Sequence, residues 1–319
     1  MKIRMQTTPN VEKPLNPCAG RVDRIFARIL GRCHFLRFGV RDRIIRQIHP
    51  PDSAVPEAFE VPFYGRRYPG DLSVFIDWSV FYYGAYAAEE LRLMRDFTRP
   101  LRSPVVVDAG ANIGHHTLFA STIASHVHAF EPFPPVADKV REKIVRNKLG
   151  NVTLHPVGLG ERAARLPYHP PSSNNTGTGS FHPSSSATPP LELSIVKGSE
   201  HLRECGVGHV DFLKIDVEGF EVAVLKGFDE LLNHCRPVCF FEWSQSERGQ
   251  DCTVGRDLFP DDYCFFEFQD RAIRAGIFQS SHYRLRRIGN NWPDGNLLAV
   301  PNEFADRHRH TIQALDKAL

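Results

Sequence analysis

The sequence lacks the features that mark several large classes of protein. Its seven cysteines, among 319 residues, form no Cys-x-x-Cys pair, so neither a zinc finger nor a disulfide framework is predicted. It has no run of about 18 apolar residues and no apolar segment near its start, so we expect neither a membrane span nor a secretory signal. The formal net charge of +2 gives the whole chain no general attraction for nucleic acid. These absences predict a reduced, cytoplasmic protein.

What is present is an alternation of predicted strands and helices. Apolar runs such as PVVVDAG at 104–110, VHAFEP at 127–132 and HVDFLKIDV at 209–217 are separated by segments with helical spacing. Continuous apolar strands of this kind are typical of a parallel sheet that is covered by helices on both faces. The fold class is therefore predicted to be α/β.

The composition changes along the chain and divides it into three parts. Residues 1–60 are expected to be a polar tail followed by a basic amphipathic helical extension, and residues 61–100 an aromatic-rich segment that packs on the core or on the substrate side. Residues 101–319 form the main domain, with a Pro/Ser-rich insertion at 170–190. A polar insertion of this length is either a lid or a surface loop.

Two segments of the N-terminal parts each allow two interpretations. Residues 21–48 have helical spacing and eight arginines against two aspartates, a local net charge of +6. Such a helix either docks on its own domain with arginines in water or contacts an anionic membrane surface. Nine aromatic residues lie within 61–86 and form either a ligand wall or a core or subunit contact, which leaves a homo-oligomer open.

The strongest local motif is a glycine turn after an apolar strand. Val105–Gly114 reads VVVDAGANIG, in which Asp108 ends the strand and Gly110 and Gly114 permit positive φ and a close approach of backbone. Ligands of open α/β sheets bind at such strand ends. The spacing is neither Gly-x-Gly-x-x-Gly nor a Walker motif, so a pyrophosphate site is not predicted.

A second acid follows at the distance expected for a nucleoside-binding site. Glu131 lies 23 residues after Asp108, at the end of the next predicted strand. An acid about 20 residues beyond the glycine turn can accept hydrogen bonds from ribose hydroxyls. Because Asp108 can meet an ammonium group, the pair fits S-adenosylmethionine, a cationic adenosine ligand, better than an anionic dinucleotide. Alternatively, the two acids are a helix cap and a turn residue.

A third motif places several ionisable groups at one strand end. Residues 210–221 read VDFLKIDVEGFE, in which Asp216 and Glu218 can serve as a general base, a metal site or an anchor for a substrate hydroxyl. Lys214 is expected to pair with a carboxylate. Glu221 can instead occupy the first turn of the following helix, where acids are favoured.

The segments Asp108–Gly114, Phe130–Pro132 and Lys214–Glu221 together resemble the three signatures of the FkbM-family methyltransferases, in the same order and with similar separations. The resemblance runs from about Phe59 to Pro301. It implies a class I methyltransferase Rossmann-like fold with a mostly parallel seven-stranded sheet, helices on both faces and an antiparallel last strand. It also implies S-adenosylmethionine as the donor and a hydroxyl oxygen as the acceptor.

Site residues follow from the motifs and from this resemblance. The residues expected to bind the cofactor are Asp108, Gly110, Asn112, Gly114 and Glu131. The catalytic candidates are Asp216, assisted by Glu218, and Glu242 at the end of another strand, with His115 and His116 within reach. Asp216 is a base or a ligand of a divalent metal, and metal dependence stays open.

Two further features bear on the acceptor. Asn175 and Gly177 resemble the family's Asn-Gly segment before the fourth strand. Family members often have Gly-x-Tyr-Glu upstream, where this chain has Ala87; either Glu89 or Glu90 takes the place of that acid, or the acceptor pocket differs.

The sequence thus favours O-methylation of a hydroxyl on a small-molecule or glycan acceptor, sugar-containing or a natural product. A nucleotide-dependent oxidoreductase is disfavoured by the missing glycine motif. A non-catalytic relative that binds adenosine ligands and acts in partner or membrane recruitment stays open. A nucleic-acid substrate is not expected, because the net charge is small.

Overall fold

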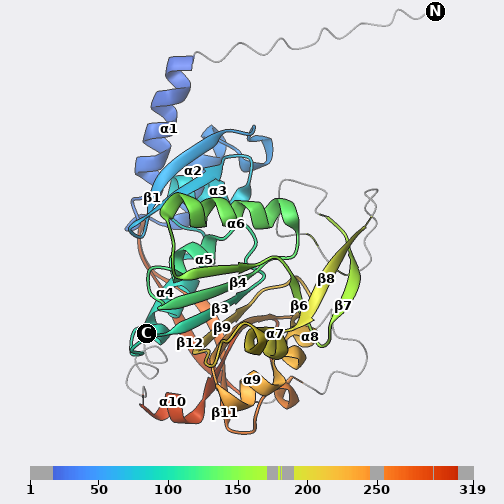
Figure 1. The fold of residues 1–319 in the computed structure, drawn as a ribbon. Helices are drawn as coiled ribbons and strands as arrows, with labels where there is room; N and C mark the ends of the chain where they lie inside the picture. Colours follow the sequence, from blue (N-terminus) through green and yellow to red (C-terminus); the bar gives the residue numbers. More distant parts are fainter. Residues whose placement is uncertain are drawn as a thin grey trace, which may run out of the picture.

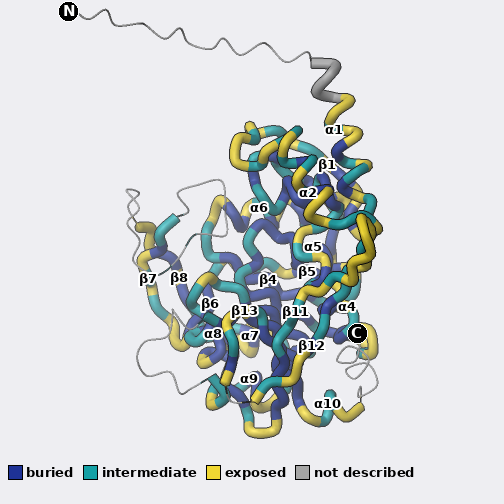
Figure 2. The backbone as a smooth tube through the Cα atoms, turned by 180° about the vertical axis from the view of Figure 1, so that it is seen from behind, coloured by how far each residue is buried: buried dark blue, intermediate teal, exposed yellow. Residues whose placement is uncertain are grey.

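The computed structural model describes residues 17–170, 179, 181, 190–244, 255–289 and 291–307. A large sheet runs through the centre of the molecule, with helices on both of its faces and an N-terminal layer at one end (Figure 1). In Figure 2 the buried residues concentrate in the strands of this sheet. No helix within the described ranges is both long and apolar enough to span a bilayer.

The large sheet has eight strands in the described part of the chain. Their order is β12 (Phe278–Ile288), β11 (Tyr263–Ala275), β13 (Gly295–Pro301), β10 (Val238–Trp243), β9 (Phe212–Ile215), β3 (Val105–Ala109), β4 (His126–Phe130) and β5 (Val152–His155). Neighbours from β5 to β10 are parallel, whereas β13 is antiparallel to both β10 and β11. The α/β class and the antiparallel last strand are therefore confirmed.

The strand count differs from the seven that the sequence analysis expected. β12 forms a long antiparallel hairpin with β11 and adds an eighth strand at the edge of the sheet. Its sequence, FQSSHYRLRRI, mixes polar and basic residues with few apolar ones. An edge strand needs no continuous apolar run, because only part of it is buried, so the pattern that revealed the central strands could not reveal this one.

Residues that are adjacent along the central strands point to opposite faces of the sheet. Val106 on β3 and Phe212 on β9 contribute to the core on one face, together with residues of α4 and α5. Val107 and Leu213 contribute to the core on the other face, together with residues of α7, α8 and α9. The helices are α4 (Ala88–Thr98), α5 (His115–Ala120), α6 (Pro134–Asn147), α7 (Gly198–Glu204), α8 (Glu221–Gly227), α9 (Asp229–His234) and α10 (Asn302–Arg307). This alternation gives each face its own apolar layer.

A second, small sheet lies beside the main one and was not predicted. Its strands, in order, are β6 (Gly158–Gly160), β8 (Leu191–Lys197) and β7 (Ala164–Tyr168). The insertion at 170–190 connects β7 to β8. Within it only residues 170, 179, 181 and 190 are described, so the lid hypothesis and the Asn175–Gly177 resemblance lie outside the described residues.

The basic segment at 21–48 forms two helices, α1 (Pro17–Gly31) and α2 (Phe38–Ile48), and not the single helix expected. Short 3₁₀ helices η1 (Pro51–Ser53) and η3 (Arg256–Leu258) complete the helical elements described. Gly31 ends α1. A Cβ atom there would lie 2.3 Å from the carbonyl oxygen of Tyr82, so glycine allows the end of α1 to approach α3 (Phe75–Tyr83) closely.

Two arginines of this segment are placed differently from the expectation, whereas Arg32 and Arg43 are exposed. Arg24 forms an ion pair with Glu57, and the guanidinium of Arg28 lies 4.5 Å from the ring centre of Phe81, so both contact the protein instead of standing in water. Among its described side chains, α1 exposes four apolar ones, Val22, Ile25, Phe26 and Ile29, together with Asp23.

The aromatic segment is mostly core. It forms the hairpin of β1 (Ala58–Phe63) and β2 (Arg66–Asp71), followed by α3 (Phe75–Tyr83). Tyr68 is fully buried, donates a hydrogen bond to Asp77 and lies under the ammonium group of Lys143 on α6, 4.5 Å from the ring centre. Because β2 packs on α6, residues 61–100 share the apolar core of the main domain.

Candidate active site

A pocket opens at the carboxyl ends of β3, β4 and β9. Here β4 and β5 follow β3 on one side of the sheet, whereas β9 and β10 lie on its other side. The pocket encloses about 690 Å³, including solvent at its mouth. The described residues that line it are Gly110, Asn112, Phe130, Glu131, Pro132, Gly158, Leu159, Tyr168, Gly179, Phe181, Asp216, Val217, Glu218 and Phe220. This is the place where open α/β sheets bind their ligands. Five of the predicted site residues therefore meet in one cavity.

The glycine turn brings two strand ends into contact. Gly110 has φ of +80°, and a Cβ atom there would lie only 1.9 Å from the carbonyl oxygen of Asp216. The N–H groups of Gly110 and Ala111 both donate to the carbonyl oxygen of Phe130, at 3.1 and 2.9 Å. Gly114 also has φ of +80° and precedes α5. The predicted need for positive φ at both glycines is confirmed, and Gly114 is not among the described lining residues.

Glu131 is held rigidly at the wall of the pocket. One carboxylate oxygen accepts the N–H of Asn112 and the other accepts the N–H of Phe133, both at 2.9 Å. Burial raises the pKa of Glu131 to about 7, although the two backbone N–H groups act to lower it. Since each carboxylate oxygen can accept more than one hydrogen bond, both keep acceptor capacity. Glu131 is therefore positioned to receive a pair of donors from a ligand in the pocket.

Asp108 lies behind this pocket and does not appear among its described lining residues. It is fully buried, and its Oδ2 accepts a hydrogen bond of 2.6 Å from Thr117. Its Oδ1 has no hydrogen-bond donor within the described chain and lies 3.7 Å from Nζ of Lys214. A direct contact between Asp108 and a ligand stays a prediction, whereas its contact with Lys214 is a buried ion pair.

Lys214 joins two carboxylates, as the sequence predicted. It is also buried, and its Nζ lies 3.1 Å from Oδ2 of Asp216. Burial alone would lower the pKa of Lys214, but the negative charges of Asp216, Asp108 and Glu90 outweigh this effect and raise it. Conversely, burial would raise the pKa of Asp216, but the neighbouring ammonium lowers it. Asp216 is therefore ionised at neutral pH, with 45% of its side chain exposed.

The turn after β9 carries two glutamates in different environments: Glu218 is exposed and Glu221 is buried. Glu218 is exposed, lines the pocket and has φ of +52°, an uncommon conformation for a residue with a side chain. Glu221 is buried in the first turn of α8, and its Oε1 accepts the N–H of Val217 at 2.9 Å. Burial raises the pKa of Glu221 to about 7. Glu221 thus stabilises the start of the helix, and Glu218 faces the cavity.

One wall of the pocket is aromatic, and the sequence analysis missed it. Tyr168 on β7 contacts Phe181, with ring centres 5.2 Å apart, and Phe181 contacts Phe220, 5.4 Å away. Aromatic side chains provide large apolar surfaces at low entropic cost. The only signal in the sequence was an isolated aromatic residue, Phe181, within a polar run.

A second pocket, of about 660 Å³ including open solvent, is lined by Glu89 and Glu90, the two acids proposed to replace the family's upstream glutamate. Its described lining residues are Tyr86, Ala87, Glu89, Glu90, Phe268, Asp270 and Asn296. Nε2 of His116 lies 3.2 Å from Glu90, and the side-chain amide of Asn296 donates to Glu90 at 3.1 Å. Glu242 pairs in register with Asn296 but is not among the described residues that line either pocket.

These features define a class of protein before any comparison. A mostly parallel sheet in which β13 runs in the opposite direction between β10 and β11, with a glycine turn and a strand-end acid, has the architecture of the class I methyltransferase fold. A family described as "Methyltransferase FkbM domain" matches residues 108–285, which is more than half of the chain. The chain belongs to the FkbM methyltransferase family.

Individual relatives match only part of this chain, at identities of about one third. "Hexuronic acid methyltransferase AglP" of Haloferax volcanii is 33% identical over 128 residues, which cover 40% of this chain and 51% of that protein. "31-O-demethyl-FK506 methyltransferase FkbM" of Streptomyces tacrolimicus is 31% identical over 160 residues, covering 40% of this chain and 60% of that protein. The chain thus spans little more than half the length of these curated relatives.

A solved structure is also similar. It is a crystal structure of methyltransferase FkbM from Methylobacillus flagellatus, with 15% identity and a TM-score of 0.39, covering 88% of this chain and 60% of that one.

Proposed function

We propose that this protein is an S-adenosylmethionine-dependent methyltransferase that methylates a hydroxyl group of a small-molecule or glycan acceptor. The observation that carries the proposal is Glu131, a buried carboxylate with spare acceptor capacity beside the glycine turn. Membership of the FkbM family supports it. The printed names of two relatives, which act on a hexuronic acid and on 31-O-demethyl-FK506, support a sugar-containing or natural-product acceptor.

The residues of the first pocket fit this donor. Glu131 would accept hydrogen bonds from the two ribose hydroxyls, and Gly110 lets the turn after β3 lie directly against the carbonyl group of Asp216 at the pocket. The aromatic wall around Phe181 and Tyr168 offers apolar surface to the adenine base. The donor supplies an electrophilic methyl group on sulfur, and the protein aligns the acceptor oxygen with it, an effect worth about 7–11 kcal/mol in favourable cases.

The acceptor hydroxyl must also lose a proton. Asp216 is ionised and half exposed at the first pocket, so it would accept a hydrogen bond from the hydroxyl, assisted by Glu218. Its lowered pKa makes it a weak base, since a general base works best with a pKa near the working pH. The other candidates for this role are His116, whose Nε2 lies 3.2 Å from Glu90, and Glu242 on β10.

A divalent metal at Asp216 does not fit the residues around it. Nζ of Lys214 lies 3.1 Å from Oδ2 of Asp216 and already provides the positive charge that this carboxylate needs. A dication there would face a buried ammonium that cannot move into water without leaving Asp108 unpaired. We therefore derive no catalytic step from a metal at this position.

Calorimetric titration with S-adenosylhomocysteine tests the donor site. Glu131 must be ionised to accept hydrogen bonds from both ribose hydroxyls, and the pKa of Glu131, about 7, lies above the ordinary value of a glutamate. The affinity should therefore be about ten-fold higher at pH 8 than at pH 6, because at pH 6 binding must first remove a proton. Glu131→Gln should bind about 10–150-fold more weakly than wild type at pH 8, from about 1.5–3 kcal/mol of lost hydrogen bonding, and should show no such pH dependence.

The controls separate this site from a general effect. Glu161→Gln changes an exposed glutamate whose carboxylate lies 3.7 Å from Lys226, so its titration should match wild type at both pH values. A folded wild-type protein that does not bind S-adenosylhomocysteine would refute the proposal. Binding without transfer of a labelled methyl group to any hydroxyl acceptor would favour the non-catalytic alternative.

We further propose that α1 contacts an anionic membrane surface. Val22, Ile25, Phe26 and Ile29 recur every three or four residues, form one face of the helix and are 54–65% exposed. The segment around them has a formal net charge of +6. Arg24 and Arg46 are paired with Glu57 and Asp42, but Arg32 and Arg43 are exposed, and this basic charge favours anionic lipid over a second copy of the same helix.

Co-sedimentation with vesicles tests this contact. The protein should bind vesicles that contain phosphatidylserine and not neutral phosphatidylcholine vesicles, and Phe26→Glu should abolish binding. Val145→Glu, at an exposed apolar residue on α6, is the matched control and should leave binding unchanged. If Phe26→Glu instead dissolves a dimer and leaves vesicle binding intact, the face is a subunit interface.

A further inference from the structure

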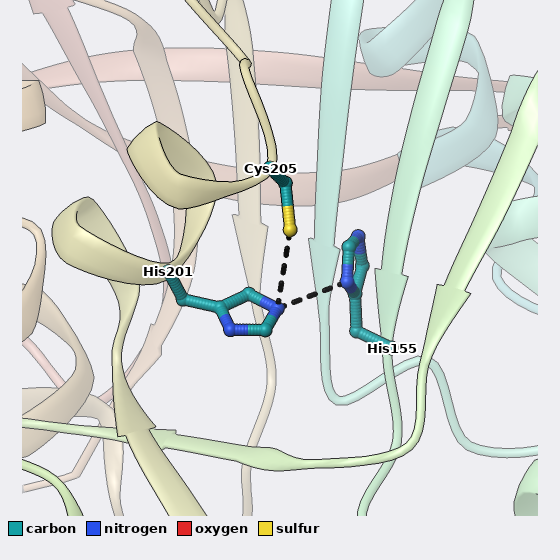
Figure 3. A group of neighbouring side chains, drawn as sticks. All are labelled: His155, His201 and Cys205. Atoms are coloured by element: carbon teal, nitrogen blue, oxygen red, sulfur yellow. Dashed lines mark hydrogen bonds between the residues drawn. The ribbon is translucent and has the colours of Figure 1, made fainter.

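A cluster of two histidines and one cysteine lies outside the proposed active site. His155 ends β5, while His201 and Cys205 lie one helical turn apart at the end of α7 (Figure 3). Nδ1 of His155 is 3.0 Å from Nε2 of His201, which is 3.8 Å from Sγ of Cys205. The three atoms all lie within 4.8 Å of one another. The side chains thus converge on one point from two separate elements.

This set of atoms has the chemistry and the spacing of a zinc site. Imidazole nitrogen and thiolate sulfur are the ligands that Zn²⁺ prefers, at about 2.0 and 2.3 Å. In a tetrahedron with these bond lengths, neighbouring ligand atoms are about 3.3–3.6 Å apart. Two of the observed separations, 3.0 and 3.8 Å, lie on either side of these values, and the third pair of atoms lies within 4.8 Å, so rotations of the side chains can bring the three ligand atoms around one ion. The i, i+4 spacing of His201 and Cys205 places both on one face of their helix.

The surroundings orient the histidine that comes from the sheet. Nε2 of His155 lies 3.1 Å from Nδ1 of His128 on β4, so a proton on Nε2 can be donated to His128, which leaves the lone pair of Nδ1 facing the cluster. A zinc-binding histidine typically donates its other N–H in this way. The ring of Phe130 stacks on His155, with centres 4.4 Å apart and an interplanar angle of 13°. His155 is thus fixed by two neighbours on the adjacent strand.

From this geometry we infer that His155, His201 and Cys205 form a Zn²⁺ site with a fourth position open to water. Cys205 is exposed, which gives the ion a path from solvent. Binding would form two Zn–N bonds and one Zn–S bond and release the thiol proton to water. The site would tie α7 to β5.

The site adjoins the first pocket without being part of it. Phe130, which stacks on His155, also lines that pocket, and the N–H of Glu131 donates to the carbonyl oxygen of His155 at 3.1 Å. Zinc would therefore hold the end of β5 against the wall that carries Glu131. Zinc binding itself does not require methyl transfer, so the two proposals fail independently.

Titration of the chelator-treated full chain with ZnCl₂ in a calorimeter tests the inference. Wild type should bind one equivalent, and Cys205→Ser and His201→Ala should each weaken binding at least ten-fold. Neither side chain is buried, so both variants should fold, which far-ultraviolet circular dichroism checks. With Co²⁺ in place of Zn²⁺, wild type should show a thiolate-to-metal charge-transfer band that Cys205→Ser lacks.

Matched controls come from another helix end. Cys235→Ser and His234→Ala alter a half-buried cysteine and an exposed histidine at the end of α9, and both should bind Zn²⁺ as wild type does. Equal affinity in wild type and Cys205→Ser, or the lack of a charge-transfer band in wild type, would overturn the proposed site and indicate binding by other histidines.

Discussion

Lys214→Met is expected to lower the free energy of unfolding by about 3–5 kcal/mol, because it removes one partner of a buried ion pair. Asp108 is fully buried and, among the described residues, would keep the hydroxyl of Thr117 as its one hydrogen-bond partner. The loss of Lys214 would destabilise the charge of Asp216 less than that of Asp108, because almost half of the Asp216 side chain is exposed to solvent. Urea unfolding at pH 7, followed by circular dichroism, measures the change.

Two comparisons identify the cause of this loss. Asp108→Asn combined with Lys214→Met removes the orphaned charge and should recover most of the lost stability. Lys226→Met removes an exposed lysine 3.7 Å from Glu161 and should change the free energy of unfolding by less than about 0.5 kcal/mol. A loss as small in Lys214→Met as in Lys226→Met would mean that the buried pair contributes little.

Gly110→Ala is expected to abolish binding of S-adenosylhomocysteine and to lower the free energy of unfolding by about 3 kcal/mol or more. The new Cβ atom would lie 1.9 Å from the carbonyl oxygen of Asp216, so the turns after β3 and β9 must move apart. That movement would break the hydrogen bond from the N–H of Asp216 to the carbonyl oxygen of Ala109. Calorimetry and urea unfolding measure the two effects.

Gly65→Ala is the matched control. Gly65 has the same φ of +80°, but nothing lies within 4 Å of the position that a Cβ atom would take. Its replacement should therefore cost only the backbone strain, about 1 kcal/mol, and leave ligand binding intact. If Gly110→Ala behaves like Gly65→Ala, the close contact between the two turns is not what shapes the pocket.

Much of the first pocket could be predicted because its signals are local in the sequence. Gly110, Glu131 and the Lys214–Asp216 pair each lie at the end of an apolar strand, and strand ends of a parallel sheet meet at one edge. The placement of Asp108 behind the pocket could not be predicted in this way. It depends on the alternation of side chains, which points Asp108 toward Thr117 and Lys214.

The missed features all depend on contacts between distant segments. The aromatic wall joins Tyr168 and Phe181 to Phe220, and the pair of Glu90 and His116 joins α4 to α5. Nothing in the spacing of these residues indicates that they meet. The single helix expected at 21–48 was wrong because the helical spacing of apolar residues continues across the break between α1 and α2, where only Gly31 marks the end.

The pairing of β3 with β9 has implications for the synthesis of the chain. The N–H of Val105 bonds to Asp211, 106 residues later, so the central strand cannot gain its second neighbour until those residues have been made. At about 5–20 residues per second, translation leaves this apolar edge unpaired for on the order of 5–20 s. During that interval the nascent chain exposes the unpaired edge of an apolar strand, which can pair with other chains.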